Sequence, residues 1–267
     1  MNDKVKAIVP AAGLGRRFGP GTNKPFEILD GKPLIVWSLE TLGSVEEIEE
    51  IIPVLKEADR EKALEVFEQY ALSKIKKIAP GGKERQDSVY NGLKLIEGQD
   101  CIVLIHDGAR PFIQKNLIEK AIRELLIPHS PPVTKGGKGK LKGYDGIILG
   151  IPVRDTIKEA EGEIIKKTLK RDSLWAIQTP QIFHYRTIFS AYENAVKEGF
   201  YSTDDAALVE KYGGKIRVIM GSYRNIKITT SEDLIAAEYF LRASNKKKIS
   251  PYPSLPKRGI PPFGKGR

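Results

Sequence analysis

The chain has 267 residues, of which 40% are hydrophobic and 29% are charged, and it carries a net charge of +10. This composition is typical of a globular protein that buries a sizeable core. The single cysteine, Cys101, excludes an internal disulfide, and with only three histidines present a thiolate zinc site is excluded too. Because no apolar run reaches the roughly 18 residues of a membrane span, and no signal peptide is evident, we expect a cytoplasmic protein.

The positive charge is concentrated in two segments. Residues 133–143 and 244–267 together hold eleven lysines and arginines and no acidic residue, so the rest of the chain carries a net charge of −1. The globular body is therefore nearly neutral, which argues against nucleic acid as its main partner. Glycine and proline are frequent in both regions, so we expect a basic surface loop at 129–143 and a disordered tail at 244–267.

Short apolar runs alternate with longer amphipathic ones through the first half of the chain. Strands are predicted at Val5–Val9, Ile48–Val54, Lys74–Ile78, Cys101–Ile105 and Asp145–Val153. Helices are predicted at Leu34–Leu42, Ala58–Leu72, Arg85–Ile96 and Asn116–Leu126. This order, with continuously apolar strands, predicts an α/β fold with a Rossmann-like, mostly parallel sheet covered by helices on both faces.

The second half of the chain has a different pattern. Alternating residues on either side of Gly162 predict a β-hairpin arm at about 154–172. Further elements are predicted as helices at His184–Glu198, Thr203–Tyr212 and Glu232–Ala243, and as strands at Ile216–Met220 and Ile226–Ile228. Asp204 and Asp205 are interpreted as acids that stabilise the start of a helix. We expect residues 1–243 to form a single domain that carries the arm.

A glycine-rich loop, residues 10–19 (PAAGLGRRFG), follows the first predicted strand, and Lys24 stands shortly after it. Glycines let backbone N–H groups approach phosphate oxygens, and cations neutralise the remaining charge. The loop is not a dinucleotide fingerprint, which requires glycine where Phe18 stands, and it lacks the Lys-Ser or Lys-Thr of a Walker loop. Two interpretations stay open, a phosphate-binding loop and a tight turn after a strand.

Two more segments follow predicted strands. Residues 81–89 (GGKERQDSV) lead into a predicted helix, and an ordinary helix start would share this pattern. Asp107, in residues 106–111 (HDGARP), stands where α/β sheets bind ligands, and its carboxylate suits Mg²⁺ beside phosphates. A structural pair of Asp107 with an arginine is the alternative. His106 is interpreted as a turn histidine with satisfied hydrogen bonds rather than as a ligand or base.

Seven motifs in a fixed order resemble the 2-C-methyl-D-erythritol 4-phosphate cytidylyltransferase family. They are PAAGLGRRF…KP, GGKERQDSV, HDGARP, PVRDT, LWAIQTPQIF, TDDA and NIKIT, and they extend from about Lys4 to Arg242. The resemblance implies a fold of the nucleotide-diphospho-sugar transferase type. It implies transfer of CMP from CTP to 2-C-methyl-D-erythritol 4-phosphate, with release of pyrophosphate, in the non-mevalonate route to isoprenoids. It further implies Mg²⁺ or another divalent cation, and a homodimer formed through the hairpin arm.

The same resemblance assigns roles residue by residue. Arg17 and Lys24 match the catalytic residues that stabilise the transition state. Arg171, Lys227, Thr156 and Thr179 match positions that hold or line the acceptor. Matches to CTP-binding positions are Ala11, Ala12, Gly13, Gly15, Gly82, Arg85, Ser88, Asp107 and Gly108, with Asp107 also a possible metal ligand. Lys83 and Gly108 depart from the family pattern, which often has an acid and an alanine there.

Two other functions are weighed against this one. Ribitol-5-phosphate cytidylyltransferase is a close relative with a different polyol acceptor, but it tends to vary at PAAG, PVRDT and TDDA, all of which stand here. A non-catalytic protein that binds RNA or a membrane surface through its basic segments is a more remote alternative. Those segments offer only Tyr252 and Phe263 for stacking on bases, which disfavours it.

Overall fold

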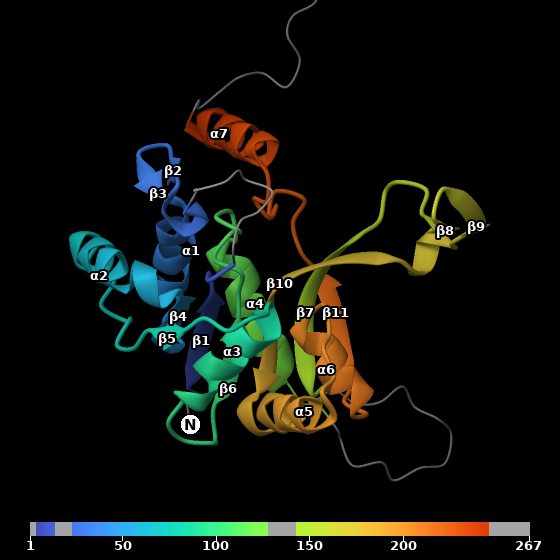
Figure 1. The fold of residues 1–267 in the computed structure, drawn as a ribbon, viewed down its shortest axis with the longest axis horizontal. Helices are drawn as coiled ribbons and strands as arrows, with labels where there is room; N and C mark the ends of the chain where they lie inside the picture. The colour runs from blue at the N-terminus through green and yellow to red at the C-terminus, as the bar shows by residue number, and fades with distance from the viewer. Residues whose placement is uncertain (1–3, 14–22, 128–142, 246–267) are drawn as a thin grey trace, which may run out of the picture.

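A seven-stranded mixed sheet is the centre of the computed structural model, which describes residues 4–13, 23–127 and 143–245 (Figure 1). Its strand order is β11-β7-β10-β6-β1-β4-β5. The strands are β1 Val5–Pro10, β4 Ile48–Leu55, β5 Ala79–Pro80, β6 Ile102–Ile105, β7 Gly146–Pro152, β10 Trp175–His184 and β11 Ile216–Met220. β10 is antiparallel to both its neighbours and the other neighbouring pairs are parallel, which confirms the mostly parallel sheet.

Helices cover both faces of this sheet, as predicted. They are α1 Leu34–Gly43, α2 Arg60–Gln69, α3 Arg85–Lys94, α4 Lys115–Leu126, α5 Tyr185–Glu198 and α6 Asp205–Lys211. Helices α1, α2 and α4 bury their apolar sides in one core cluster, and α3, α5 and α6 bury theirs in a second. The alternation of strand side chains separates the two clusters: in β6, Leu104 belongs to the first and Val103 to the second.

Strand β10 is the main element of the structure that is not among those predicted from the sequence. Its sequence contains Pro180, and a proline within an apolar run argues against a central strand because it cannot donate a ladder hydrogen bond. The structure accommodates this proline at an irregularity, since the pairing of β10 with β7 shifts register between Gln178 and Gln181. The strand therefore lies between β6 and β7 while its middle departs from the regular ladder.

Two of the predicted strands do not form as ladders. Residues 74–78 make one bridge, between Ile51 and Ile75, and the regular edge strand is the shorter β5. Residues 226–228 lie in no strand. That segment is held by contacts with neighbouring loops, including a hydrogen bond from the Ile228 N–H to the Ala109 carbonyl at 2.9 Å.

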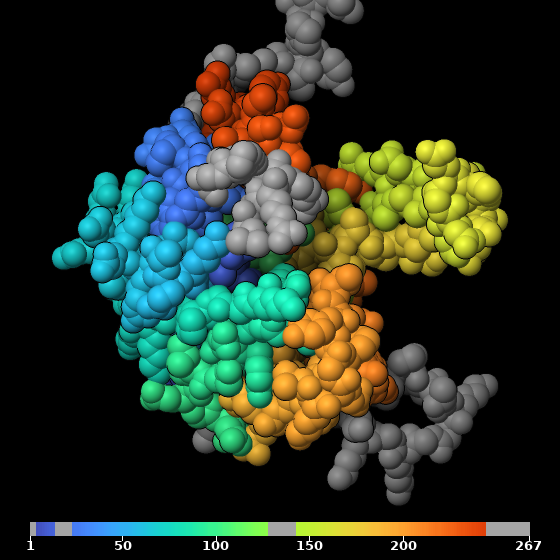
Figure 2. Space-filling model, in the orientation of Figure 1, coloured from blue at the N-terminus to red at the C-terminus, as the bar shows by residue number. Residues whose placement is uncertain are grey.

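The predicted hairpin arm is present and extends away from the body of the molecule (Figures 1 and 2). It consists of β8 Lys158–Glu161 and β9 Ile164–Thr168, joined by a turn in which Gly162 has a φ of 57°. A positive φ of this kind favours glycine because it has no Cβ. Every residue of both strands is exposed, so within one chain the arm contributes no side chain to the core.

A third, smaller cluster joins the C-terminal helix to the body. Helix α7 (Ser231–Asn245) and the two-stranded ribbon of β2 Ile28–Leu29 and β3 Lys32–Pro33 contribute to it. At the start of α7, Thr230 and Asp233 exchange side-chain to backbone hydrogen bonds, which form a capping box. The basic loop and the tail lie almost wholly outside the described residues. Within those residues, no helix combines the length and the apolar character that crossing a membrane requires.

Candidate active site

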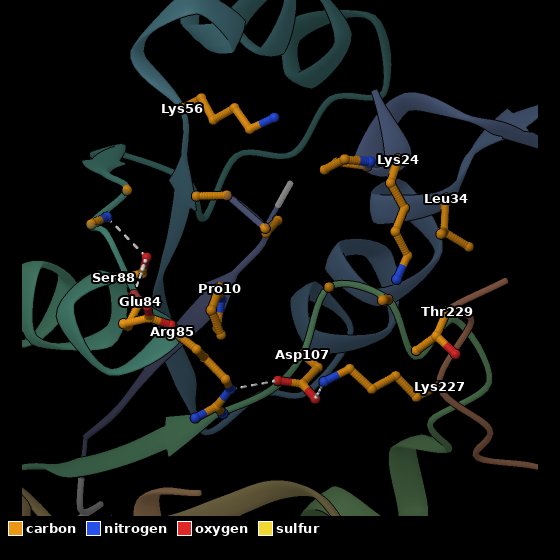
Figure 3. Close-up of a pocket in the computed structure, with 18 of the residues that line it drawn as sticks. Pro10, Lys24, Leu34, Lys56, Glu84, Arg85, Ser88, Asp107, Lys227 and Thr229 are labelled. Carbon is orange, nitrogen blue, oxygen red and sulfur yellow. Dashed lines mark hydrogen bonds and ion pairs between the residues drawn. The ribbon is translucent and has the colours of Figure 1, made fainter. Parts of the chain in front are cut away.

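A cleft of about 900 Å³ lies where the parallel strands β1, β4, β5 and β6 end (Figure 3). The carboxyl ends of these strands meet at one edge of the sheet, which is where open α/β sheets bind ligands. The lining comes from the residues that directly follow those strands, from residues 24–34 and from residues 227–229. The lining residues are Pro10, Ala11, Ala12, Gly13, Lys24, Pro25, Leu34, Lys56, Glu57, Gly81, Gly82, Lys83, Glu84, Arg85, Ser88, Asp107, Gly108, Ala109, Lys227 and Thr229.

Most of the residues assigned from the sequence lie together in this cleft. They are Ala11, Ala12, Gly13, Lys24, Gly82, Arg85, Ser88, Asp107, Gly108 and Lys227. In Figure 3 Lys24 extends downward into the cleft, and Lys227 extends across it below Lys24 to reach Asp107. Gly15 and Arg17 lie outside the described residues, so their predicted roles stay predictions.

The loop between β5 and α3 lies close against the end of β1. A Cβ at Gly81 would overlap the side chain of Ala12, and a Cβ at Gly82 would overlap Asp87. Glycine is therefore required at both positions for the chain to pass this closely. The Gly82 N–H donates to the Ser88 hydroxyl at 2.9 Å, and this hydroxyl donates to the Glu84 carbonyl at 3.1 Å. These bonds fix one wall of the cleft before any ligand enters.

Asp107 is the electrostatic centre of the cleft. Its Oδ1 atom accepts from Arg85 Nε at 3.1 Å, and its Oδ2 atom lies 2.8 Å from Lys227 Nζ. Arg110 Nε is 3.7 Å from the same Oδ2. Burial opposes ionisation of this carboxyl, but the neighbouring cations, with Arg85 the strongest, outweigh burial and hold its pKa well below the ordinary range. Asp107 is therefore a carboxylate at any physiological pH.

Lys227 reaches the cleft because the segment before it is anchored on two sides. The Asn225 side-chain amide donates to the Thr179 carbonyl at 2.9 Å, and the Asn225 carbonyl accepts from Arg110 Nη1 at 2.8 Å. Asn225 is fully buried. Polar groups removed from water have to find such partners, so this asparagine fixes the path of the chain into the site.

Thr179 lies beneath the cleft rather than in its lining. Its hydroxyl oxygen accepts from the Asp107 N–H at 3.0 Å and is 3.2 Å from His106 Nδ1. His106 Nε2 lies 3.2 Å from the Arg110 carbonyl, which can only accept, so Nε2 carries the proton and Nδ1 accepts from Thr179. The interpretation of His106 as a satisfied turn histidine is confirmed. The predicted acceptor contact of Thr179 stays a prediction.

Thr156 and Arg171 are not brought to the cleft of their own chain. Arg171 belongs to a short 3₁₀ turn, Arg171–Ser173, at the base of the arm, and its Nη1 donates to the Arg154 carbonyl at 2.7 Å. Thr156 lies on the other side of the arm, just before β8, and is exposed. Neither residue lines the cleft formed within a single chain.

Two functional candidates were not assigned from the sequence. Lys56 follows β4 directly and lines the cleft. A cation just past a buried parallel strand was the signal that could have identified it. Asp205 was interpreted as a helix-stabilising acid, but it is fully buried and forms a bidentate ion pair with Arg85. Nothing in its local sequence pattern indicates that partner, 120 residues away.

The carboxylates of the cleft fit a metal ion held mainly by substrate. Within the described residues no group of three or more Asp, Glu, His or Cys side chains could hold a metal alone. Mg²⁺ often binds through one or two protein carboxylates and the phosphates of a nucleotide. Asp107 supplies one ionised carboxylate in the cleft, and each of its oxygens can accept a further contact.

A mostly parallel α/β sheet, with a cationic and glycine-bounded cleft at its strand ends, is the architecture of a nucleotide-binding transferase. Comparison with known proteins identifies the particular family. The model of the 2-C-methyl-D-erythritol 4-phosphate cytidylyltransferases matches residues 5–243. The chain belongs to this family, and it is a cytidylyltransferase of non-mevalonate isoprenoid biosynthesis.

Individual relatives agree with this assignment. A protein of that name from Geotalea uraniireducens is 40% identical over 92% of this chain and 100% of its own length. One from Caldanaerobacter subterraneus is 42% identical over 89% of this chain and 99% of its own. The crystal structure of 4-diphosphocytidyl-2C-methyl-D-erythritol synthase from Anaerococcus prevotii superposes with a TM-score of 0.75 at 32% identity, covering 90% of this chain and 97% of that one.

The buried histidine makes stability depend on pH. Burial lowers the pKa of His106 from 6.5 to about 4, so as the pH falls the unfolded chain binds this proton first. We expect the free energy of unfolding to fall by about 2 kcal/mol between pH 7 and pH 5 from this residue. Urea denaturation at both pH values measures this change in the free energy of unfolding. His106→Gln should remove this part of the pH dependence, and the exposed His184→Gln should retain it. An unchanged pH dependence in His106→Gln would contradict the prediction.

Proposed function

We propose that the cleft binds CTP and that the residues around Asp107 carry out transfer of CMP to 2-C-methyl-D-erythritol 4-phosphate. The observation that carries this proposal is the ionised Asp107 between Arg85 and Lys227, with Lys24 lining the same cleft. A site with several fixed cations and one ionised carboxylate is suited to bringing two phosphate-bearing molecules together. The backbone at Ala11, Ala12 and Gly13 can approach the triphosphate, and the Gly82–Ser88 wall and Gly108 are the proposed contacts for cytosine and ribose.

The reaction needs charge stabilisation more than proton transfer. A phosphate oxygen of the acceptor attacks the α-phosphorus of CTP, a new P–O bond forms, and the bond to the β-phosphate bridging oxygen breaks to release pyrophosphate. The attacking oxygen is already anionic, so no general base is required. Asp107 agrees with this, because its low pKa makes it a poor proton acceptor. Lys24 and, by the family resemblance, Arg17 are proposed to stabilise charge on the transferring phosphoryl group.

Lys227 is proposed to hold the acceptor phosphate while Asp107 fixes its position. A divalent cation bound to Asp107 and the nucleotide phosphates would withdraw charge from the α-phosphorus. Lys56, at the β4 side of the cleft, adds a further cation that can bind the triphosphate. The cytoplasmic location expected from the sequence stays a prediction.

We also propose that the arm completes the acceptor side of the site in a homodimer. The arm carries Arg171 and Thr156 away from the cleft of its own chain, and Ile164 and Ile165 on β9 are 71% and 54% exposed. Apolar side chains exposed in this way are typical of a surface that another chain covers. An arm that reaches a partner subunit would place its acceptor residues at the partner's cleft.

The acceptor is tested directly by measuring pyrophosphate release from CTP. We expect turnover with 2-C-methyl-D-erythritol 4-phosphate, and we expect ribitol 5-phosphate to be used far less efficiently. The two polyols differ in length and branching, while the nucleotide is the same. The comparison is therefore between the kcat/KM values for the two acceptors. Equal or greater efficiency with ribitol 5-phosphate would overturn the proposed acceptor without affecting the cytidylyl-transfer chemistry.

Lys24 should affect the chemical step more than binding. We expect Lys24→Ala to lower kcat by roughly 10²- to 10³-fold, because it removes a charge that stabilises the transition state. The KM for CTP should rise by a smaller factor. Steady-state kinetics with saturating acceptor measures both quantities. Lys120→Ala, an exposed lysine of α4 outside the cleft, is the matched control. Near-normal kcat in Lys24→Ala would count against the assignment.

The arm should determine both association and acceptor use. Replacing Ile164 and Ile165 together by serine should give a monomer in light scattering, because the exposed apolar pair is lost. The KM for the acceptor should rise in that variant, with CTP binding retained. Ile235→Ser, which changes a 70% exposed isoleucine on α7, is the control and should leave both properties unchanged. A wild-type protein that is monomeric at working concentration would refute the proposed dimer.

A further inference from the structure

Asp205 is a fully buried acid that lies outside the lining of the cleft. It stands at the first residue of α6, and both of its oxygens are engaged by one arginine. Arg85 Nη1 donates to Oδ1 at 2.9 Å, and Arg85 Nη2 donates to Oδ2 at 2.8 Å. The Tyr192 hydroxyl, from α5, also donates to Oδ1 at 2.5 Å. A bidentate pair of this kind fixes the plane of the guanidinium as well as its position.

The third nitrogen of the same guanidinium reaches the cleft. With Nη1 and Nη2 held by Asp205, the direction of Nε is determined because the group is planar. Nε points at Asp107 Oδ1 at 3.1 Å, as Figure 3 shows, and Asp107 Oδ2 in turn holds Lys227 Nζ at 2.8 Å. A continuous set of hydrogen bonds and ion pairs therefore runs from α6 to the lysine proposed to hold the acceptor phosphate.

We propose that Asp205 is a positioning residue for the nucleotide site, acting through Arg85 on the carboxylate of Asp107. It holds Arg85 against Asp107, and this keeps Arg85 in the cleft wall instead of leaving it free to turn toward the phosphates or into solvent. The inference rests on the proposed roles of Arg85 and Asp107 in CTP binding. Asp205 is the second acid of the TDDA segment. Its position at the start of α6 indicates only helix stabilisation, whereas the proposal gives it the role of holding Arg85 in place.

Positioning and simple electrostatics make opposite predictions for one substitution. The described cluster contains three cations, Arg85, Arg110 and Lys227, and two anions, Asp107 and Asp205. Asp205→Asn removes one anion and makes the cluster more positive. If charge alone governed the site, the polyanion CTP would bind more tightly to this variant. If Asp205 positions Arg85, CTP binds more weakly despite the added positive charge.

Stability has to be separated from positioning, because removing one partner of a buried ion pair destabilises the fold. Tyr192→Phe provides a milder change. It removes one hydrogen bond to Asp205 Oδ1 while the ion pair and nearly all of the side-chain volume remain. Asp204→Asn is the matched control at the same helix end, since its side chain accepts from the Ala207 N–H and the Gln181 amide and does not contact Arg85.

The test measures CTP affinity by calorimetry on the full chain with Mg²⁺ and without acceptor, together with the KM for each substrate. We expect Asp205→Asn to weaken CTP binding roughly 10- to 100-fold, as loss of a partner behind a site residue typically does. The KM for CTP should rise by a larger factor than the KM for the acceptor, because Asp205 holds Arg85 directly and reaches Lys227 only through Asp107. Tyr192→Phe should shift CTP binding in the same direction by a smaller factor, and Asp204→Asn should leave it unchanged.

A double-mutant cycle identifies the route of the effect. Because Asp205 acts through Arg85, Asp205→Asn should cause no further loss of CTP affinity in the Arg85→Ala background. Additive losses, or unchanged or tighter CTP binding in folded Asp205→Asn, would overturn the inference while leaving the proposed site intact. If Asp205→Asn does not fold, unchanged CTP binding in Tyr192→Phe overturns it. Unchanged affinity in Arg85→Ala alone would overturn the proposed nucleotide role of Arg85 as well.

Discussion

The ion pairs of Asp107 are the interaction on which the rest of the site depends. A carboxylate removed from water is costly unless cations and hydrogen bonds compensate it. Here β6 places Asp107 at the sheet edge, α3 supplies Arg85, and the segment after β11 supplies Lys227. Segments far apart in the sequence are thus held together by ion pairs with the Asp107 carboxylate. Losing that carboxylate would leave several cations close together without a counter-charge. The same change would therefore disrupt the site and destabilise the local fold.

The parallel arrangement of the strands explains why these groups can meet. Strands that run in the same direction end at the same edge, so each following loop contributes to one cleft. The glycines at positions 81 and 82 then allow the loop after β5 to lie against the loop after β1. Beneath the cleft, the Thr179 hydroxyl and neutral His106 support the backbone of Asp107. The position of the Asp107 backbone is therefore fixed from below by buried side chains.

Periodicity and motif order were sufficient to predict most of the sheet, its two helical layers and about half of the residues that line the cleft. They did not predict β10, in which Pro180 interrupts the strand and is accommodated at a local irregularity of the ladder. They failed at Lys74–Ile78 and Ile226–Ile228, where the alternation of residues is strand-like but the first segment makes a single bridge and the second lies in no strand. Asp205 could not be assigned, since its partner Arg85 is distant in sequence and only the packing of α6 beside α3 and α5 brings them together. Arg171 and Thr156 lie away from the cleft because the hairpin that carries them leaves the sheet.

The antiparallel course of β10 has a consequence for how this fold can vary. β7 ends where β10 begins, with Pro152 paired to Trp175, so the chain leaves the sheet and returns to it through adjacent positions. The residues between these two leave the sheet, so their number does not alter the register of any strand of the seven-stranded sheet. Insertions and deletions in the arm can therefore be tolerated by the body of the enzyme, while changing how far the arm extends. The length of the arm can therefore change, in evolution or by engineering, without a change in the strand order or pairing of the sheet.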